Sequence, residues 1–221
     1  MTGAPQLFFD EGTYEPIRVP WYHGQEPELV LPRPRGYMVL PGWPQIERLI
    51  TDHGLVARRL PEPMELEVET IRVSDPVLGS TPYQGTTMIQ EFEVSRQTER
   101  RSVPAGAVWV PANQPDFEVA VQLFEPEAPD SMLRWGLLNT VFERKEYIGS
   151  QHLAELADEM LSDAAVRSAW EIALQDEAFA SDAQARYLWW YRRTPYWDEE
   201  VGLLPVLRVM ELPTLPAIDG Q

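Results

Sequence analysis

The order of apolar and polar positions in the first third of the chain predicts two strands joined by a helix. Residues 37–40 form a short apolar run that is typical of a strand. From Pro44 onward, apolar side chains recur at helical spacing until Gly54, a residue that favours helix termination. Residues 55–60 predict a second strand. The segment 37–60 therefore indicates a β-α-β unit.

The next part of the chain has the period of β-strands. Residues 64–73 alternate between apolar and charged side chains, and a slip near Thr70 indicates a β-bulge. Residues 86–95 and 102–110 predict two further strands, separated by polar residues. The sequence Pro-Ala-Gly at 104–106 predicts a sharp turn. We expect these segments to belong to one sheet.

Helical spacing replaces the strand pattern after Pro115. From about residue 150 to Thr194 the chain is predicted to be almost wholly helical, with an apolar stripe that begins at Leu153. Ser181 and Gln184 fit a capping box, which indicates a helix start at that point.

Together these elements predict an α+β fold, with a mixed sheet of about five or six strands and a helical C-terminal third. Residues 1–35, rich in proline, glycine and aromatic side chains, predict an extended lead-in. Residues 36–208 form the predicted α+β domain, with its helical part at 115–194, and residues 209–221 form a tail. We expect the helices to cover a face of the sheet.

Composition narrows the classes of function. The chain has 221 residues, a net charge of −17 and no cysteine. The acidity disfavours binding to nucleic-acid phosphates. The lack of cysteine excludes disulfides, thiolate metal sites and cysteine nucleophiles. No apolar run approaches the roughly 18 residues of a membrane span, so we expect no membrane partner.

Recognisable catalytic motifs are absent from the sequence. Of the three histidines, only His152 lies at a metal-ligand spacing from another potential ligand, because His152 and Glu155 form an H-x-x-E pattern. A zinc site needs a third strong ligand, and no histidine follows His152. Both side chains should lie on the solvated face of a helix, so we interpret them as a surface pair. Neither a G-x-S-x-G elbow nor a phosphate-binding glycine loop occurs.

An aromatic cluster near the end of the helical part is the strongest candidate surface. Aromatic and arginine side chains are enriched in such surfaces at interfaces. The residues that we expect to form a docking or ligand-binding surface are Trp189, Trp190, Arg192, Arg193, Tyr196 and Trp197. Three interpretations stay open for this cluster: packing of the protein core, docking against another domain, and binding of a peptide or sugar ligand.

Five stretches, taken in order, carry a resemblance to a known family. They are residues 17–22, 32–43, 103–115, 123–148 and 191–198. This set resembles the region that follows the catalytic domain in bacterial zinc carboxypeptidase-like proteins of the M14 type. The resemblance implies a parent protein that removes C-terminal residues from peptides with a zinc-activated water. The zinc ligands, the glutamate base and the arginine that grips the substrate carboxylate belong to the catalytic domain, and none is assigned to this chain.

The resemblance therefore implies a non-catalytic accessory domain of an M14-like metallocarboxypeptidase, which supports the catalytic domain or shapes its substrate cleft. The expected partners are that domain, in cis or in trans, and its peptide substrate, with zinc bound outside this chain. A periplasmic or secreted parent is compatible with the sequence, but the compartment stays open. The main alternative is a freestanding module that binds peptide or glycan through the cluster at 187–197. An enzyme of another type is a third alternative.

Overall fold

The computed structural model describes residues 3, 5, 16–24, 26–144 and 147–215. The chain divides into two units, residues 1–32 and residues 33–221. In the first unit, the described stretches 16–24 and 26–32 contain neither helix nor strand. All of the regular structure described below belongs to the second unit.

Six strands form one antiparallel sheet in the order β2-β5-β1-β6-β3-β4. They are β1 (Gly36–Val39), β2 (Arg58–Arg59), β3 (Met64–Leu78), β4 (Ile89–Val103), β5 (Val108–Pro111) and β6 (Val206–Val209). The predicted α+β fold and number of strands are confirmed. The predicted mixed sheet is not found. The strands β1 and β2 run in the same direction, but they do not pair with each other, because each pairs with β5 in the antiparallel sense.

The longest element is the ribbon of β3 and β4, each of 15 residues. The predicted break between residues 95 and 102 was wrong, because the polar residues 96–101 pair with β3 at residues 66–71. The irregularity also lies elsewhere: the register is regular at Thr70 and shifts between Ser74 and Val77. The ladder continues through polar residues because their backbone groups pair regardless of side-chain polarity.

Strand β6 lies at the centre of the sheet and was missed by sequence reasoning. All four of its residues are buried, and it pairs with β1 on one side and β3 on the other. A strand that is buried on both faces shows no alternation of apolar and polar residues. Here the run is only four residues long and contains Arg208, so periodicity had nothing to detect.

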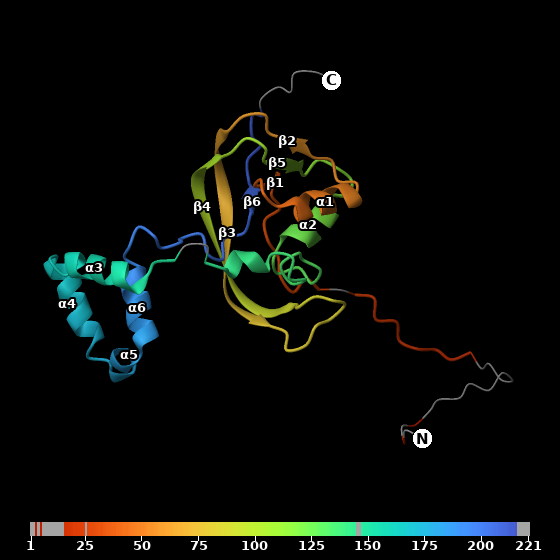
Figure 1. The fold of residues 1–221 in the computed structure, drawn as a ribbon. Coiled ribbons are helices and arrows are strands. Elements are labelled where there is room, and N and C mark those ends of the chain that lie inside the picture. The colour runs from red at the N-terminus through yellow and green to blue at the C-terminus, as the bar shows by residue number, and fades with distance from the viewer. Residues whose placement is uncertain (1–2, 4, 6–15, 25, 145–146, 216–221) are drawn as a thin grey trace. The chain divides into compact units, whose positions relative to one another are not determined.

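The first helices cover one face of the sheet. Helix α1 (Pro44–Asp52) begins with proline in its first turn and ends before Gly54, whose φ of +67° is the left-handed conformation expected after a helix. Helix α2 (Phe117–Phe124) follows Pro115 as predicted. Figure 1 shows both helices beside β1 and β5. One apolar cluster joins Ile46 of α1 and Phe117 of α2 to alternate strand residues, including Tyr37, Val39 and Val110.

The other sheet face has a second apolar cluster made of the intervening strand residues. It contains Met38, Leu66, Val68, Trp109, Leu207 and Val209, and it includes Leu60 and Ala107 from the connections at the sheet's end. The alternation of side chains along each strand thus separates two cores.

The remaining helices form a cluster of their own. They are α3 (Ser150–Met160), α4 (Ala164–Ala173), α5 (Glu177–Ser181) and α6 (Ala183–Tyr191), preceded by the 3₁₀-helix η1 (Asn139–Phe142). Their shared core contains Ile148, Leu153, Ala157, Trp190 and Tyr191 and no strand residue. The expectation that the C-terminal helices cover the sheet is therefore corrected: α1 and α2 cover it, whereas α3–α6 bury their apolar stripes against each other.

Aspartates cap the helices α4, α5 and α6. The side chain of Asp163 accepts a hydrogen bond at the start of α4, and Asp182 accepts from the amides of Gln184 and Ala185 at the start of α6. The capping box predicted from Ser181 was wrong, since Ser181 is the last residue of α5. Asp182 is a better cap than Ser181, because its negative carboxylate also interacts favourably with the positive end of the helix dipole. Among the described residues, no helix is long and apolar enough to cross a membrane.

Candidate functional site

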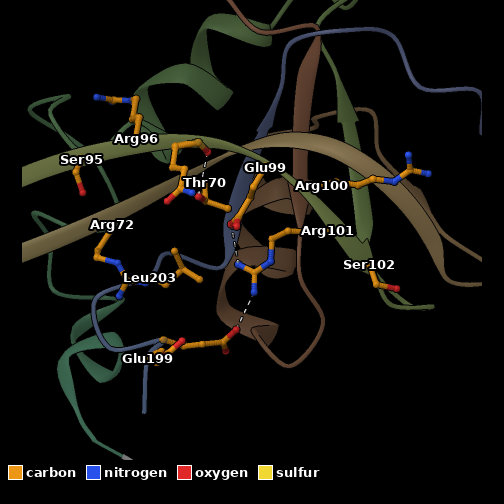
Figure 2. Close-up of a pocket in the computed structure, with 12 residues that line it drawn as sticks. Thr70, Arg72, Ser95, Arg96, Glu99, Arg100, Arg101, Ser102, Glu199 and Leu203 are labelled. Carbon is orange, nitrogen blue, oxygen red and sulfur yellow. Dashed lines mark hydrogen bonds and ion pairs between the residues drawn. The ribbon is translucent and has the colours of Figure 1, made fainter. Parts of the chain in front are cut away.

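A polar pocket with a volume of about 690 Å³ lies on one face of the β3–β4 ribbon. The ribbon contributes most of its lining, and the loop before β6 contributes the rest. The residues that line it are Thr70, Arg72, Ser95, Arg96, Gln97, Glu99, Arg100, Arg101, Ser102, Glu199, Glu200 and Leu203. Figure 2 shows Glu99 and Arg101 pointing toward one another, while Arg100 points away. This volume lies in the range of small-ligand sites.

The loop wall of the pocket is fixed to β3 by backbone hydrogen bonds. The amide of Val73 donates to the carbonyl of Gly202 at 2.8 Å, and the amide of Leu204 donates to that of Ile71 at 2.9 Å. Gly202 has a φ of +77°, and a Cβ at this position would lie 2.2 Å from the Val73 carbonyl oxygen. Only glycine permits so close an approach of the two backbones. The wall is thus held in a defined position.

The charges inside the pocket are arranged around Arg101. Its Nη2 lies 2.8 Å from an oxygen of Glu200, and its Nη1 lies 3.8 Å from an oxygen of Glu99. The Glu200 side chain is 71% exposed, so this ion pair is open to solvent. Arg72 instead donates to the backbone carbonyl of Val201, which ties it to the wall. The pocket therefore holds the guanidinium group of Arg101, a side chain that is 25% exposed, between the carboxylates of Glu99 and Glu200.

The opposite face of the same strands carries a buried ionic network. Arg208, whose side chain is 1% exposed, donates through Nε to Glu125 at 2.8 Å and through Nη1 to Glu69. Tyr37 also donates to Glu125, at 2.7 Å. Burial, followed by the charge of Glu125 and the hydrogen bond to it, raises the pKa of Tyr37 far above its usual range. The tyrosine therefore stays a neutral donor.

Arg96 extends this network toward the end of α2. Its two terminal nitrogens each lie 2.7 Å from an oxygen of Glu127, which is a bidentate pair, and one also contacts Glu125 at 3.2 Å. Buried charges of this kind are stable only when paired and hydrogen-bonded. The network joins β3, β4, β6 and the residues after α2, and its role in the fold is structural. Sequence reasoning missed it, although a single arginine within an apolar run at 206–209 was a usable signal.

The structure brings the predicted aromatic surface together but buries part of it. Trp190 is 8% exposed and belongs to the core of the α3–α6 cluster, where its ring centroid lies 4.8 Å from that of Trp170. Trp189 packs on the same ring at 4.9 Å. Tyr191, which the predicted surface did not include, is 2% exposed and packs edge-on against Trp197. Packing of these rings accounts for most of the cluster.

The arginines of the predicted surface stack on its tryptophans. Arg193 lies over the ring of Trp189, with 3.5 Å between the guanidinium carbon and the ring centroid, and Arg192 lies 5.5 Å from that of Trp197. Burial against the protein, and then the charge of Arg192, lowers the pKa of Arg193 from its ordinary value. Tyr196 stays solvent-facing, at 41% exposure, and Arg192 and Arg193 are exposed as well.

His152 and Glu155 lie on the surface of α3. The Nδ1 of His152 is 3.4 Å from Glu155, both side chains are more than half exposed, and the Tyr196 hydroxyl lies 3.5 Å from Nε2. In the parts of the chain that the structure describes, no three His, Cys, Asp or Glu side chains gather as a metal site. These residues therefore do not fit the three-ligand requirement of a catalytic zinc ion.

Comparison with known proteins identifies a related region. The chain is 31% identical over 115 residues to carboxypeptidase 2 of Trichophyton rubrum, which covers 51% of this chain and 21% of that protein. It is 32% identical over 108 residues to carboxypeptidase 2 of Trichophyton tonsurans, covering 48% and 20%. No protein-family model matches the chain, and no solved structure matches it significantly. The chain thus contains a carboxypeptidase-related region and spans about a fifth of the length of these relatives.

Proposed function

We propose that this chain is a non-catalytic accessory region of an M14-like zinc metallocarboxypeptidase, which supports the catalytic domain or shapes its substrate cleft. The observation that carries the proposal is the match of about half of the chain to about a fifth of carboxypeptidase 2. The lack of a third metal ligand near His152 and Glu155, among the described residues, agrees with it. The zinc ion and its ligands would then belong to the catalytic domain.

The described part of residues 16–32 supports a docking role. Large apolar side chains are exposed there, with Ile17 at 79%, Trp21 at 84%, Tyr22 at 91% and Val30 at 75%. Apolar side chains concentrated in this way mark surfaces that bind a protein partner. In an accessory region, the catalytic domain is the partner that would cover them.

An association measurement tests this proposal. The 221-residue chain is mixed with the carboxypeptidase catalytic domain encoded in the same genome, and binding is followed by calorimetry. We expect a stable complex that Trp21→Ser together with Tyr22→Ser weakens at least tenfold, because these side chains are hot-spot types. Ile172→Ser, which removes a 64% exposed apolar side chain from α4, is the matched control and should leave binding unchanged.

Metal content and activity separate the accessory role from catalysis. We expect the isolated chain to hold less than one zinc ion per molecule and to release no C-terminal residues from peptides. One tightly bound zinc per chain with turnover would overturn the proposal. Absence of any complex with the catalytic domain would equally count against it.

For the predicted aromatic surface, we retain docking only for its solvent-facing part. Tyr196 is exposed and lies beside His152, and Arg193 covers Trp189. Tyr196→Ser should weaken the complex if this part contacts the catalytic domain. A change in the affinity for free peptide or glycan, without a change in the complex, would favour the freestanding binding module instead.

A further inference from the structure

We propose that the pocket between the β3–β4 ribbon and the loop at 199–203 binds a short peptide by its free C-terminal carboxylate, with Arg101 as the carboxylate-binding residue. The peptide class rests on the proposed relation to carboxypeptidases, whereas the charge arrangement rests on the pocket alone. Arg96 is the one pocket-lining residue that also belongs to the buried network, and no residue of the predicted aromatic surface lines the pocket.

The position of Arg101 in the β3–β4 ladder directs its side chain toward the pocket. On β4, odd-numbered residues from Ser95 to Arg101 share the face of Thr70 and Arg72, because successive side chains on a strand alternate. Even-numbered Arg96 faces the buried network instead, where two glutamates hold it. Arg101 is therefore the arginine of β4 that the ladder presents to the pocket, as Figure 2 shows.

The present partner of Arg101 is exchangeable. Glu200 holds it at 2.8 Å, but a side chain that is 71% exposed gains little from such a pair, about 0 to 1 kcal/mol for solvent-exposed ion pairs. A ligand carboxylate can bind the planar guanidinium group in the bidentate geometry that arginine favours. A peptide C-terminus would thus replace the Glu200 carboxylate without leaving a buried charge unpaired.

The remaining lining groups fit the other end of a short peptide. Glu99 lies 3.8 Å from Arg101 on the strand side, and Glu199 and Glu200 line the pocket from the loop. Their carboxylates can accept hydrogen bonds from an ammonium group, while Ser95 and Gln97 offer polar groups to a peptide backbone. A ligand with one carboxylate and one cationic end satisfies both signs of charge. A free phosphate would satisfy only Arg101.

The pocket is prepared for this ligand by its rigid wall. Gly202 brings the loop backbone against β3, and the carbonyl of Val201 fixes Arg72. Because the wall is held by backbone hydrogen bonds, little ordering accompanies ligand entry, and less binding free energy is lost to entropy.

Titration of the 221-residue chain with the dipeptide Lys-Ala, followed by calorimetry, tests the inference. We expect binding that C-terminal amidation of the dipeptide weakens at least tenfold, because the charged hydrogen bonds to Arg101 are lost. Arg101→Ala should weaken binding of the free dipeptide to the same extent. The matched control is Arg48→Ala, whose side chain on α1 is 82% exposed and is not among the residues that line the pocket, and it should leave binding unchanged.

Two further variants separate a binding role from a structural one. Glu200→Gln should tighten binding, because it removes the competing carboxylate, whereas damage to the fold would weaken it. Glu99→Gln should weaken binding of Lys-Ala more than that of the dipeptide with acetylated amino groups. Equal binding of amidated and free dipeptide, equal binding of inorganic phosphate and Lys-Ala, or unchanged binding in Arg101→Ala would each overturn the inference. The association test with the catalytic domain is independent, so failure of one proposal is distinguishable from failure of the other.

Discussion

At the scale of single residues, the buried arginine of β6 decides how the sheet is assembled. Arg208 is 1% exposed and satisfies two carboxylates from different elements, Glu69 of β3 and Glu125 after α2. Sequence reasoning could not place these contacts, because the partners are separated by 139 and 83 positions along the chain. The sequence showed that the chain is acidic, but it gave no means of distinguishing the glutamates of this network from the other members of a set of 35 acidic residues.

Replacing this arginine should destabilise the protein strongly. Arg208→Met removes the buried cation that Glu69 and Glu125 share and leaves Arg96 alone to offset their charge, and breaking a buried pair costs about 3–5 kcal/mol. The free energy of unfolding from urea denaturation measures the effect. Arg100→Ala, with a side chain that is 77% exposed, is the control and should change stability by less than about 0.5 kcal/mol. Equal effects in both variants would contradict the assigned role of the network.

The raised pKa of the Tyr37 hydroxyl predicts how the free energy of unfolding depends on pH in the alkaline range. Its folded-state pKa lies above the unfolded value of 10.0, so above about pH 10 the unfolded state releases a proton that the folded state retains. The stabilising contribution is therefore complete below pH 10 and decreases as the pH rises, by up to about 1.4 kcal/mol per pH unit. Tyr37→Phe should lose this part of the slope. Unfolding free energies measured between pH 8 and 11 would reveal an unchanged slope if the assignment is wrong.

At the scale of elements, periodicity predicted the helices and the alternating part of β3, and it failed for the middle of β4 and for β6. Helices α1 and α2 appear where apolar spacing placed them. Strand β4 was divided in two because residues 96–101 are polar on both faces, and only the structure shows that one face enters the ionic network and the other lines the pocket. Alternation reports burial, so a strand whose two faces are both polar gives no signal.

The close contact of the 199–203 loop with β3 can be tested by glycine substitution. In Gly202→Ala, the added Cβ would meet the Val73 carbonyl oxygen at 2.2 Å, so the loop must move away from the strand. Gly54→Ala is the matched control, since Gly54 also has a positive φ, of +67°, but nothing lies within 4 Å of its Cβ position. We expect a cost of about 1–2 kcal/mol for Gly54→Ala and a larger one for Gly202→Ala in urea denaturation. Similar values for the two would show that the loop adapts freely.

At the scale of the whole molecule, the second unit contains separate apolar cores. The sheet has one core on each face, and α3–α6 share another that includes no strand residue. Composition predicted a folded α+β protein but could not predict this partition, because apolar stripes on helices do not specify which surface they cover. The same reason left the aromatic cluster open between core packing and docking until Trp190 was seen to be buried.

Because α3–α6 have an apolar core of their own, we expect this helical cluster to unfold locally without unfolding of the sheet. Trp190→Ala should cost the cluster about 3–5 kcal/mol, as expected for truncation of a buried tryptophan. Hydrogen exchange followed by mass spectrometry should then show lost protection in α3–α6 and retained protection in β1 and β6. Simultaneous loss of protection in all elements would show that the cores unfold as one.

The outer position of β4 has a consequence for solubility. This strand has β3 as its only strand neighbour within the described sheet, so one side of a 15-residue backbone offers hydrogen-bonding groups to any other extended chain. Glu91, Glu93 and Arg100 are exposed charged residues of this outer strand. Exchange of all three for threonine should remove the electrostatic barrier, and the protein should then form intermolecular β-structure at concentrations where the natural sequence stays dispersed.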